Sequence, residues 1–202
     1  MIAIIDYGRG NLRSVQKGLE KSGYQAVITG DPKVMNEAGG IILPGVGAFA
    51  DAMNQLRELK LVEPILDSIQ SGKPFLGICL GMQVLFEQGE EHGIHRGLGV
   101  FPGRVVKFPP GPKVPHMGWN QLHIKQASPL LDGVPEDGAF YFVHSFYAEP
   151  GESSLILATS DYGLEFPAVA GRGNVFGVQF HPEKSSSLGL KILQNFGGIV
   201  EL

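Results

Sequence analysis

Short apolar segments that alternate with helical ones limit the fold of this chain more than any other feature of its sequence. The expected strands cover residues 2–6, 25–29, 40–45 and 74–78. The expected helices follow Asn11, follow Asp31-Pro32, cover 49–72 in two pieces that separate before Pro64, and cover 80–88. Strands joined through helices run parallel and are covered on both faces, so functional residues gather beyond the carboxyl ends of the strands.

The second half of the sequence changes to strand-like runs that glycine, proline and polar residues separate. Arg172-Gly173-Asn174 is typical of a hairpin tip, and a final helix is expected over 186–196. No repeat, low-complexity tract or linker interrupts the chain. We therefore expect one domain over residues 1–202. Its fold would be a three-layer α/β fold, with an open, mixed and mainly parallel sheet flanked by helices and an antiparallel β extension.

The charge and the cysteine content make several classes of protein unlikely. The 202 residues carry a net charge of -4, and the 16 Lys and Arg are spread thinly, which disfavours a nucleic-acid partner. One cysteine rules out an internal disulfide and fits a reducing compartment. No apolar run approaches the ~20 residues of a membrane-spanning helix, and no basic segment precedes the first strand. We expect no membrane partner, no signal peptide and a cytoplasmic location.

The only cysteine, Cys79, lies in the stretch GICLG, where an expected strand meets an expected helix. A lone cysteine in an apolar run is most simply a small core residue, because free cysteine is among the most buried residue types. Glycine two positions before and after it, however, matches the pattern of a nucleophile elbow. In such a turn the helix dipole favours a thiolate, and the N–H of Leu80 faces a developing oxyanion.

A cysteine nucleophile needs a base, and the stretch QFHPEKS supplies the best of the six histidines. His181 and Glu183 are two residues apart, so on an extended segment their side chains leave the same side of the chain. His181 would take the thiol proton while Glu183 holds its other ring nitrogen. A polar strand end without a catalytic role explains this pattern equally well, because the sequence does not show that it approaches Cys79.

The expected strand over 40–45 runs into a glycine-rich turn, Pro44-Gly45-Val46-Gly47. A backbone of this kind is able to aim N–H groups into a site beside Cys79. On its own, a simple surface turn is the commoner meaning of the pattern.

Two other patterns point to a cofactor or a metal, and we reject both. Gly8-Arg9-Gly10 begins a dinucleotide fingerprint, but Arg13 occupies the third glycine position. His92 and His95 have an H-x-x-H spacing without a clear third ligand, so a solvated loop is the simpler explanation. We expect neither a cofactor nor a metal.

The elbow, the glycine turn and the His-Pro-Glu segment together resemble the class I (triad) glutamine amidotransferases, which have a flavodoxin-like fold. GICLGMQ and QFHPEKS carry this resemblance, which covers essentially the whole chain. IIDYGRGNLRSV, LPGVGAF and PHMGWN make the chain similar, within that family, to the glutaminase subunits of imidazole glycerol phosphate synthases. The oxyanion segments of pyridoxal-phosphate synthase and anthranilate synthase glutaminases differ from LPGVGAF.

The resemblance implies hydrolysis of glutamine to glutamate and ammonia. Cys79 would attack the side-chain amide and form a glutamyl thioester. His181 would protonate the leaving ammonia and then activate water, with Glu183 orienting it. The oxyanion hole would consist of the N–H of Leu80 and one N–H from the Val46–Gly47 peptide.

The resemblance also implies a set of substrate-binding residues. By position, the residues that would hold glutamine are Gly47, Gln83, Glu91 and Ser145. Glu91 would suit the ammonium group of the substrate, and Gln83 its carboxylate end. Relatives can carry tyrosine at the position of Phe146, so a hydroxyl contact there is absent.

The family pairs this subunit with a cyclase, a (βα)₈ barrel whose lumen conducts the ammonia. The cyclase forms imidazole glycerol phosphate and an aminoimidazole carboxamide ribonucleotide (AICAR) in histidine biosynthesis. The chain has no barrel repeats of its own, so the resemblance implies a heterodimer with a separate cyclase. Asn11, Trp119, Tyr141 and Lys184 match interface positions of the family. A sole tryptophan is more often a core residue, and an exposed Trp119 anchor is the sharper interpretation.

Two other functions stay open. The chain could be the glutaminase of another synthase, such as pyridoxal-phosphate or anthranilate synthase. It could instead be a non-catalytic regulatory binding module whose cysteine is vestigial or a redox sensor. Cys79, His181 and Glu183 are all present, which argues against a lost catalytic function.

Overall fold

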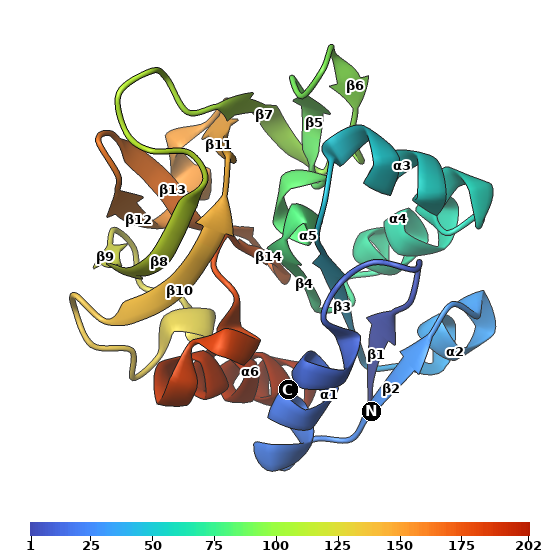
Figure 1. The fold of residues 1–202 in the computed structure, drawn as a ribbon. Coiled ribbons are helices and arrows are strands. Elements are labelled where there is room, and N and C mark those ends of the chain that lie inside the picture. The colour runs from blue at the N-terminus through green and yellow to red at the C-terminus, as the bar shows by residue number, and fades with distance from the viewer.

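The computed structural model describes residues 1–202 and contains one large central sheet (Figure 1). Its eight strands lie in the order β2 (Ala26–Thr29), β1 (Ile2–Ile5), β3 (Gly40–Gly45), β4 (Phe75–Cys79), β14 (Val175–Val178), β13 (Glu165–Arg172), β12 (Ile156–Asp161) and β9 (His123–Ile124). Neighbouring strands from β2 to β14 are parallel, and those from β14 to β9 are antiparallel. The expectation of a mixed sheet with an antiparallel extension is confirmed.

Helices cover both faces of the parallel part of this sheet (Figure 1). On one face lie α1 (Leu12–Lys21) and α6 (Ser186–Val200), which contact each other. On the other face lie α2 (Pro32–Glu37), α3 (Phe49–Glu58) and α4 (Val62–Gln70). Short 3₁₀ helices occur at η1 (Pro129–Leu131), η2 (Ser153–Leu155) and η3 (Pro182–Lys184).

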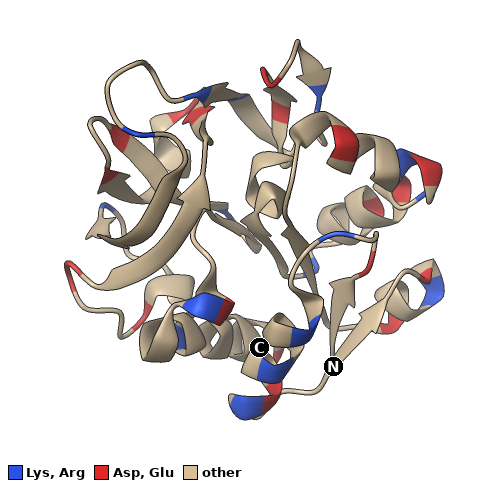
Figure 2. Ribbon diagram, viewed as in Figure 1, with Lys and Arg blue, Asp and Glu red and all other residues tan.

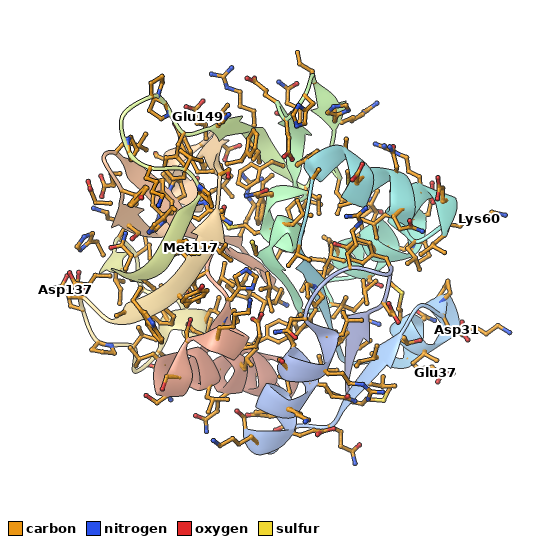
Figure 3. All side chains as sticks on the ribbon, in the orientation of Figure 1. Asp31, Glu37, Lys60, Met117, Asp137 and Glu149 are labelled. Atoms are coloured by element: carbon orange, nitrogen blue, oxygen red, sulfur yellow. The ribbon has the colours of Figure 1, made fainter.

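Two hydrophobic cores fill the spaces between the sheet and the helices. Successive side chains of a strand point to opposite faces, so β1 places Ile4 in the core beneath α1 and α6 and Ile5 in the core beneath α3 and α4. In β4, Leu76 lies in the same core as Ile4, and Phe75 lies in the same core as Ile5. Figure 3 shows the side chains that pack on both sides of the sheet. These strands are apolar throughout because both of their faces are buried.

Two smaller sheets complete the fold. One has the order β11 (Phe146–Pro150), β7 (Phe101–Lys107), β5 (Phe86–Gly89) and β6 (His95–Arg96), and the other pairs β10 (Ala139–His144) with β8 (His116–Gln121). The carbonyl oxygen of Val143 in β10 lies 4.0 Å from Sγ of Cys79. The end of β10 therefore passes the carboxyl end of β4.

The segment after β4 differs from its sequence-based expectation. The expected helix over 80–88 is wrong, because α5 covers only Leu80–Gln83 and the chain then forms β5. Phe86 is buried against Phe101, with ring centroids 5.6 Å apart, and β5 pairs with β7. Pairing with a later part of the chain thus overrides the helical pattern of this segment.

Two helix boundaries also differ from expectation. The helical region over 49–72 separates at residues 59–61, and Pro64 lies in the first turn of α4, where proline is tolerated. Helix α6 extends to Val200, beyond the expected end at 196. It is the longest helix, with 15 residues, and no helix has the length and apolar character needed to cross a bilayer.

Two turns match their expected form. The side chain of Asp31 caps α2 by accepting a hydrogen bond from the N–H of Lys33. Strands β13 and β14 form a hairpin in which Arg172 pairs with Val175, so Gly173-Asn174 is its tip. Local turn chemistry of this kind depends on residues that are neighbours in the sequence.

Acidic and basic residues are interspersed over the periphery of the molecule (Figure 2). The segment between Lys73 and Glu87 contains no charged residue, and it forms β4, α5 and the start of β5. Any formal charge at the end of β4, apart from that of Cys79 itself, must therefore come from other segments of the chain.

Gly197 and Gly198 provide a matched test of how tightly α6 packs. A Cβ on Gly197 would lie 2.3 Å from ring atoms of Tyr24, whereas one on Gly198 would meet only the Tyr24 hydroxyl, at 3.7 Å. Gly197→Ala should lower the free energy of unfolding by about 1–3 kcal/mol, as overpacking does. Gly198→Ala should leave it unchanged or raise it by up to about 1 kcal/mol, because alanine favours helix more than glycine. Denaturant unfolding measures both, and equal effects would contradict this packing.

Candidate active site

Cys79 occupies a strained backbone conformation between β4 and α5. Its φ of 54° and ψ of -110° lie in a region that a residue with a Cβ rarely adopts. Such a conformation costs about 1–3 kcal/mol and persists only where the surroundings impose it. The turn presents the sulfur at the carboxyl edge of the sheet, directly before α5.

Glycine on either side lets this turn close. A Cβ on Gly77 would lie 2.4 Å from the carbonyl oxygen of Gly81, and a Cβ on Gly81 would lie 1.8 Å from that of Leu43 in β3. Larger residues at either position would push α5 away from the sheet. The G-x-C-x-G pattern of the sequence therefore has a steric cause.

Cys79 opens onto a surface pocket that brings together most of the predicted site residues. The pocket lining includes Cys79 and His181, the oxyanion candidates Val46, Gly47 and Leu80, and the glutamine-binding candidates Gln83, Glu91 and Ser145. Glu183 lies outside this lining and reaches the pocket through its hydrogen bond with His181. Segments far apart in the sequence therefore meet at the carboxyl edge of the sheet.

The side chains of His181 and Glu183 form a buried pair. Nδ1 of His181 lies 2.9 Å from Oε1 of Glu183, and only 2% and 1% of the two side chains are exposed. Because a carboxylate only accepts hydrogen bonds, Nδ1 carries a proton. Glu183 lies on η3, a turn that Pro182 begins, rather than on the extended segment that the sequence indicated.

This environment favours the protonated imidazole of His181. Burial lowers its pKa, but interactions with Cys79 and Glu183 outweigh burial and raise the pKa from 6.5 to about 10. The other ring nitrogen, Nε2, is buried and has no hydrogen-bond partner. It is therefore free to exchange a proton with a sulfur or a substrate in the pocket.

The glycine-rich turn after β3 lies against the connection between β1 and α1. The Tyr7 hydroxyl is buried without a partner beside Gly45, where a Cβ would approach it to 2.5 Å, and burial raises the pKa of Tyr7. The guanidinium of Arg9 lies against Gly47, whose φ of +103° is a glycine conformation. Val46 is 43% exposed at the pocket. The candidate oxyanion peptide is thus supported on one side and open to solvent on the other.

The side chains of Glu91 and Gln83 each form hydrogen bonds within the protein, which leaves only some of their polar atoms for a ligand. Oε2 of Glu91 accepts a hydrogen bond of 2.8 Å from the N–H of Phe49 at the start of α3. Nε2 of Gln83 donates to the carbonyl oxygen of Phe146 and to Oε1 of Gln179, each at 3.0 Å. Only the acceptor Oε1 of Gln83 is left for a ligand, so the geometry suits a substrate N–H better than the carboxylate end.

Gln179, His116 and His144 are buried polar residues at this site that were assigned no role from the sequence, although QFHPEKS contains Gln179 and PHMGWN contains His116. Nε2 of Gln179 donates to Sγ of Cys79 at 3.7 Å. Gln179 precedes His181 by two residues in the stretch QFHPEKS, and this spacing was the available signal. The two histidines are 28 residues apart in the sequence, so no local pattern predicts their contact.

His116 and His144 form a second buried pair, which lacks a carboxylate. Nδ1 of His116 lies 3.0 Å from Nε2 of His144. Burial lowers the pKa of His116 to about 4 and that of His144 to about 3. Both imidazoles are therefore neutral at pH 7, in contrast to His181.

Aromatic and cationic side chains gather on β8, β10 and η3. Trp119 is 56% exposed, so the interpretation of the sole tryptophan as a core residue is wrong. Its ring meets that of Tyr141 edge-on at 6.1 Å, and Nζ of Lys184 lies 5.9 Å from the centre of the Tyr141 ring. Met117, on the same strand as Trp119, is 62% exposed (Figure 3). Asn11 directly precedes α1, which contacts η3.

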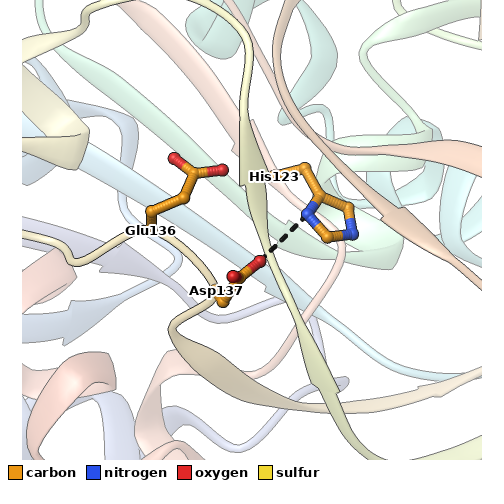
Figure 4. Close-up of side chains that lie close together, drawn as sticks. All are labelled: His123, Glu136 and Asp137. Atoms are coloured by element: carbon orange, nitrogen blue, oxygen red, sulfur yellow. Dashed lines mark ion pairs between the residues drawn. The ribbon is translucent and has the colours of Figure 1, made fainter.

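His123, Glu136 and Asp137 form a separate cluster outside the pocket (Figure 4). Their potential ligand atoms lie within 4.8 Å of one another, and Nδ1 of His123 pairs with Asp137 at 3.2 Å. Both carboxylates are exposed. Exposed pairs of this kind contribute about 0–1 kcal/mol, and none of the three residues lines the pocket at Cys79.

Known proteins are similar to this chain over nearly its whole length. A family model described as Glutamine amidotransferase class-I matches residues 3–198. The imidazole glycerol phosphate synthase subunit HisH of Desulfitobacterium hafniense (strain DSM 10664 / DCB-2) is 61% identical over 197 residues, which cover 98% of this chain and 93% of the relative. The protein of the same name from Geobacter metallireducens is 55% identical and covers 96% of each chain.

Solved structures share the fold at lower identity. A chain of PurLQS from Thermotoga maritima has a TM-score of 0.79 at 21% identity and covers 98% of this chain and 97% of its own. A structure described as a glutamine amidotransferase has a TM-score of 0.76 at 18% identity and covers 100% of both chains. At these identities the likeness concerns the fold alone.

The neutral pair of His116 and His144 should make the protein acid-sensitive. Both histidines have lower pKa values in the folded protein than in the unfolded chain, where the value is near 6.5. The unfolded chain therefore binds up to two more protons between about pH 4 and pH 6.5, and stability is lost as the pH falls. Each proton contributes about 1.4 kcal/mol per pH unit.

Denaturant unfolding between pH 4.5 and about pH 6.5 measures this slope. The double variant His116→Phe, His144→Leu should have a shallower slope than the unmodified protein, whatever its stability at pH 7. His123→Gln removes a more exposed histidine and should leave the slope unchanged. Equal slopes in all three proteins would show that the pair does not remain neutral.

Proposed function

The chain belongs to the class-I glutamine amidotransferase family, and on this basis we propose that it is the glutaminase subunit of an imidazole glycerol phosphate synthase with a separate cyclase chain. The expectation of a glutamine amidotransferase is confirmed by the family match over residues 3–198. The observation that carries the proposal is the strained Cys79 in one pocket with His181, in a chain 61% identical to a HisH subunit.

The first half of the proposed reaction transfers the glutamyl group to sulfur. The Cys79 thiolate attacks the side-chain carbonyl carbon of glutamine, and the carbonyl oxygen becomes an oxyanion. The N–H of Leu80 and an N–H of the Val46–Gly47 peptide stabilise it. The C–N bond then breaks, and Nε2 of the protonated His181 gives its proton to the leaving nitrogen, which departs as ammonia.

The second half releases glutamate. Nε2 of the now neutral His181 removes a proton from water, and the hydroxide attacks the thioester carbon. The C–S bond breaks, glutamate leaves and the sulfur returns to its thiolate form. Glu183 holds Nδ1–H throughout, so that Nε2 faces the reacting atoms in both halves.

The raised pKa of His181 supports an imidazolium as the resting form of this residue. Cys79 and Glu183 both favour the imidazolium, and the surrounding segment from 74 to 86 has no charge that would compete. A cation beside the sulfur stabilises the thiolate that attacks the substrate, because charges in a partly dry pocket are weakly screened. The thiolate is the nucleophilic form of cysteine.

The substrate contacts follow from the groups left free in the pocket. The Glu91 carboxylate suits the ammonium group of glutamine. Oε1 of Gln83 suits an N–H of the substrate, and Gly47 and Ser145 complete the lining.

The group formed by the exposed Met117, Trp119 and Lys184 with the half-buried Tyr141 supports a partner surface close to the pocket. Tyr141 belongs to β10, whose Val143 carbonyl contacts Sγ of Cys79. A chain docked on this surface would receive ammonia near its point of release. We assign this surface to the cyclase subunit in a heterodimer, which would use the ammonia to form imidazole glycerol phosphate and AICAR.

The main test is glutamate release from glutamine by the purified chain, alone and with the cyclase subunit and its nucleotide substrate. We expect low activity alone and a sharp rise on mixing. Cys79→Ala should lower the activity of the complex by about 10⁴-fold or more while the protein stays folded. Brisk activity that the cyclase does not change would favour the glutaminase of another synthase. No activity in either case would favour a non-catalytic binding module.

Gly47→Ala tests whether the partner aims the candidate oxyanion peptide. Alanine disfavours the φ of +103°, and its Cβ would lie 2.7 Å from Nη1 of Arg9, so the peptide should lose its freedom to turn. Loss of one oxyanion donor lowers a rate by about 10²–10³-fold. We expect the stimulation by the cyclase to decrease by a factor in that range, while the KM for glutamine changes much less. Unchanged stimulation would exclude this role.

A further inference from the structure

We propose that Gln179 is a further catalytic residue, whose side-chain N–H holds the Cys79 sulfur as a thiolate, and that Gln83, which is itself oriented by the carbonyl oxygen of Phe146, determines which end of the Gln179 amide faces that sulfur. The proposal rests on the proposed function, in which Cys79 is the nucleophile. The supporting observations are hydrogen bonds in which the donor and the acceptor can each be identified.

The assignment begins at His144. Its Nδ1 lies 2.8 Å from the carbonyl oxygen of Phe146, which can only accept, so Nδ1 carries the proton. His144 is neutral, and its Nε2 is therefore an acceptor. The Nδ1 atom of His116, 3.0 Å away, must then be the donor. Nε2 of His116 accepts in turn from Nδ2 of Asn120 at 3.3 Å.

Two donors converge on the Phe146 carbonyl. One is His144, and the other is Nε2 of Gln83 at 3.0 Å. Because a carbonyl oxygen only accepts hydrogen bonds, the Gln83 amide cannot turn its own oxygen toward Phe146 without repulsion, whichever ring nitrogen of His144 carries the proton. The orientation of Gln83 is therefore determined, and its second N–H points at Gln179.

The same reasoning fixes Gln179. Its Oε1 accepts from Gln83 at 3.0 Å, so Nε2 is the end that faces Sγ of Cys79 at 3.7 Å. Gln179 is 0% exposed, so water does not offer its amide an alternative partner, and both N–H groups of Gln83 are already used within the protein. An N–H donor stabilises an anionic sulfur more than a neutral thiol, because charge strengthens the hydrogen bond.

The sulfur has a second contact that suits its other protonation state. The carbonyl oxygen of Val143 lies 4.0 Å away and can accept from the thiol hydrogen. A neutral thiol would therefore turn to Val143, whereas a thiolate would accept from Gln179. The other titratable groups near the sulfur are His181 with Glu183, His144, Tyr7 and, across the pocket, Glu91. Of these groups, His181 is the cation, so Gln179 supplies a neutral donor beside it.

The proposal is tested by titrating Cys79, the only thiol of the chain. The rate of alkylation by chloroacetamide is measured against pH in the full chain without glutamine or partner, so that the result does not depend on catalytic activity. Gln179→Met keeps the length of the side chain and removes the donor. We expect the apparent pKa of the thiol to rise by about one unit, with a lower kcat for glutamate release and little change in KM.

Gln126→Met is the matched control. It removes an amide that donates to the carbonyl oxygens of Ser154 and Ile156, outside the pocket, and should leave the thiol titration unchanged. Gln179→Asn is a second variant, which keeps an amide but withdraws the N–H by one methylene, and it should raise the thiol pKa as Gln179→Met does. A folded variant of Gln179 with an unchanged thiol titration would overturn the proposal.

The unmodified protein offers a spectroscopic test that no folding defect can affect. Nitrogen-15 NMR of the histidine rings should find both His116 and His144 neutral, with the proton on Nδ1, at pH 7. A proton on Nε2 of His144 would overturn the proton assignment of the histidine pair, whereas the role of Gln179 is decided by the thiol titration, because Gln83 donates to Phe146 with either tautomer. Normal glutamate release together with an unchanged thiol titration in a folded Gln179 variant would reject the role of Gln179 and leave the proposed function intact.

Discussion

The backbone conformation of Cys79 is the constraint on which the rest of this structure depends. A residue with a Cβ is held at a φ of 54°, and this requires β3, β4 and α5 to approach so closely that neither Gly77 nor Gly81 has room for a Cβ. The cost of about 1–3 kcal/mol is small against the burial of two hydrophobic cores that lie on the faces of the sheet. The fold thereby holds one thiol at the sheet edge, where the other segments of the site converge.

The parts of this molecule that the sequence predicts are those with local causes. The G-x-C-x-G pattern indicates the turn at Cys79 because the clashes that demand glycine arise within one turn and its neighbouring strand. The alternation of strands and helices predicts the mixed sheet for a similar reason. The structure of the segment 80–88 has no such local cause. Phe86 packs against Phe101, and β5 pairs with β7, which comes later in the chain.

The chain of buried polar residues could not be predicted for the same physical reason. Gln83 and Gln179 are 96 residues apart in the sequence, and His116 and His144 are 28 apart. Each side chain alone is an ordinary polar residue in a strand-like or helical segment. Its role depends on which atom of a distant partner faces it, and only the folded structure supplies that information.

Three buried histidines near one pocket show that burial alone does not decide their charge. Desolvation lowers the pKa of all three, and it prevails at His116 and His144, which face each other and a carbonyl oxygen. At His181, the Glu183 carboxylate and Cys79 outweigh desolvation and raise the pKa. The neutral pair keeps fixed donor and acceptor roles near pH 7 because neither ring takes a second proton there, whereas His181 can gain and lose one. Strand β8 carries both His116 and the exposed Trp119, so one residue of this pair and the candidate partner surface belong to one strand.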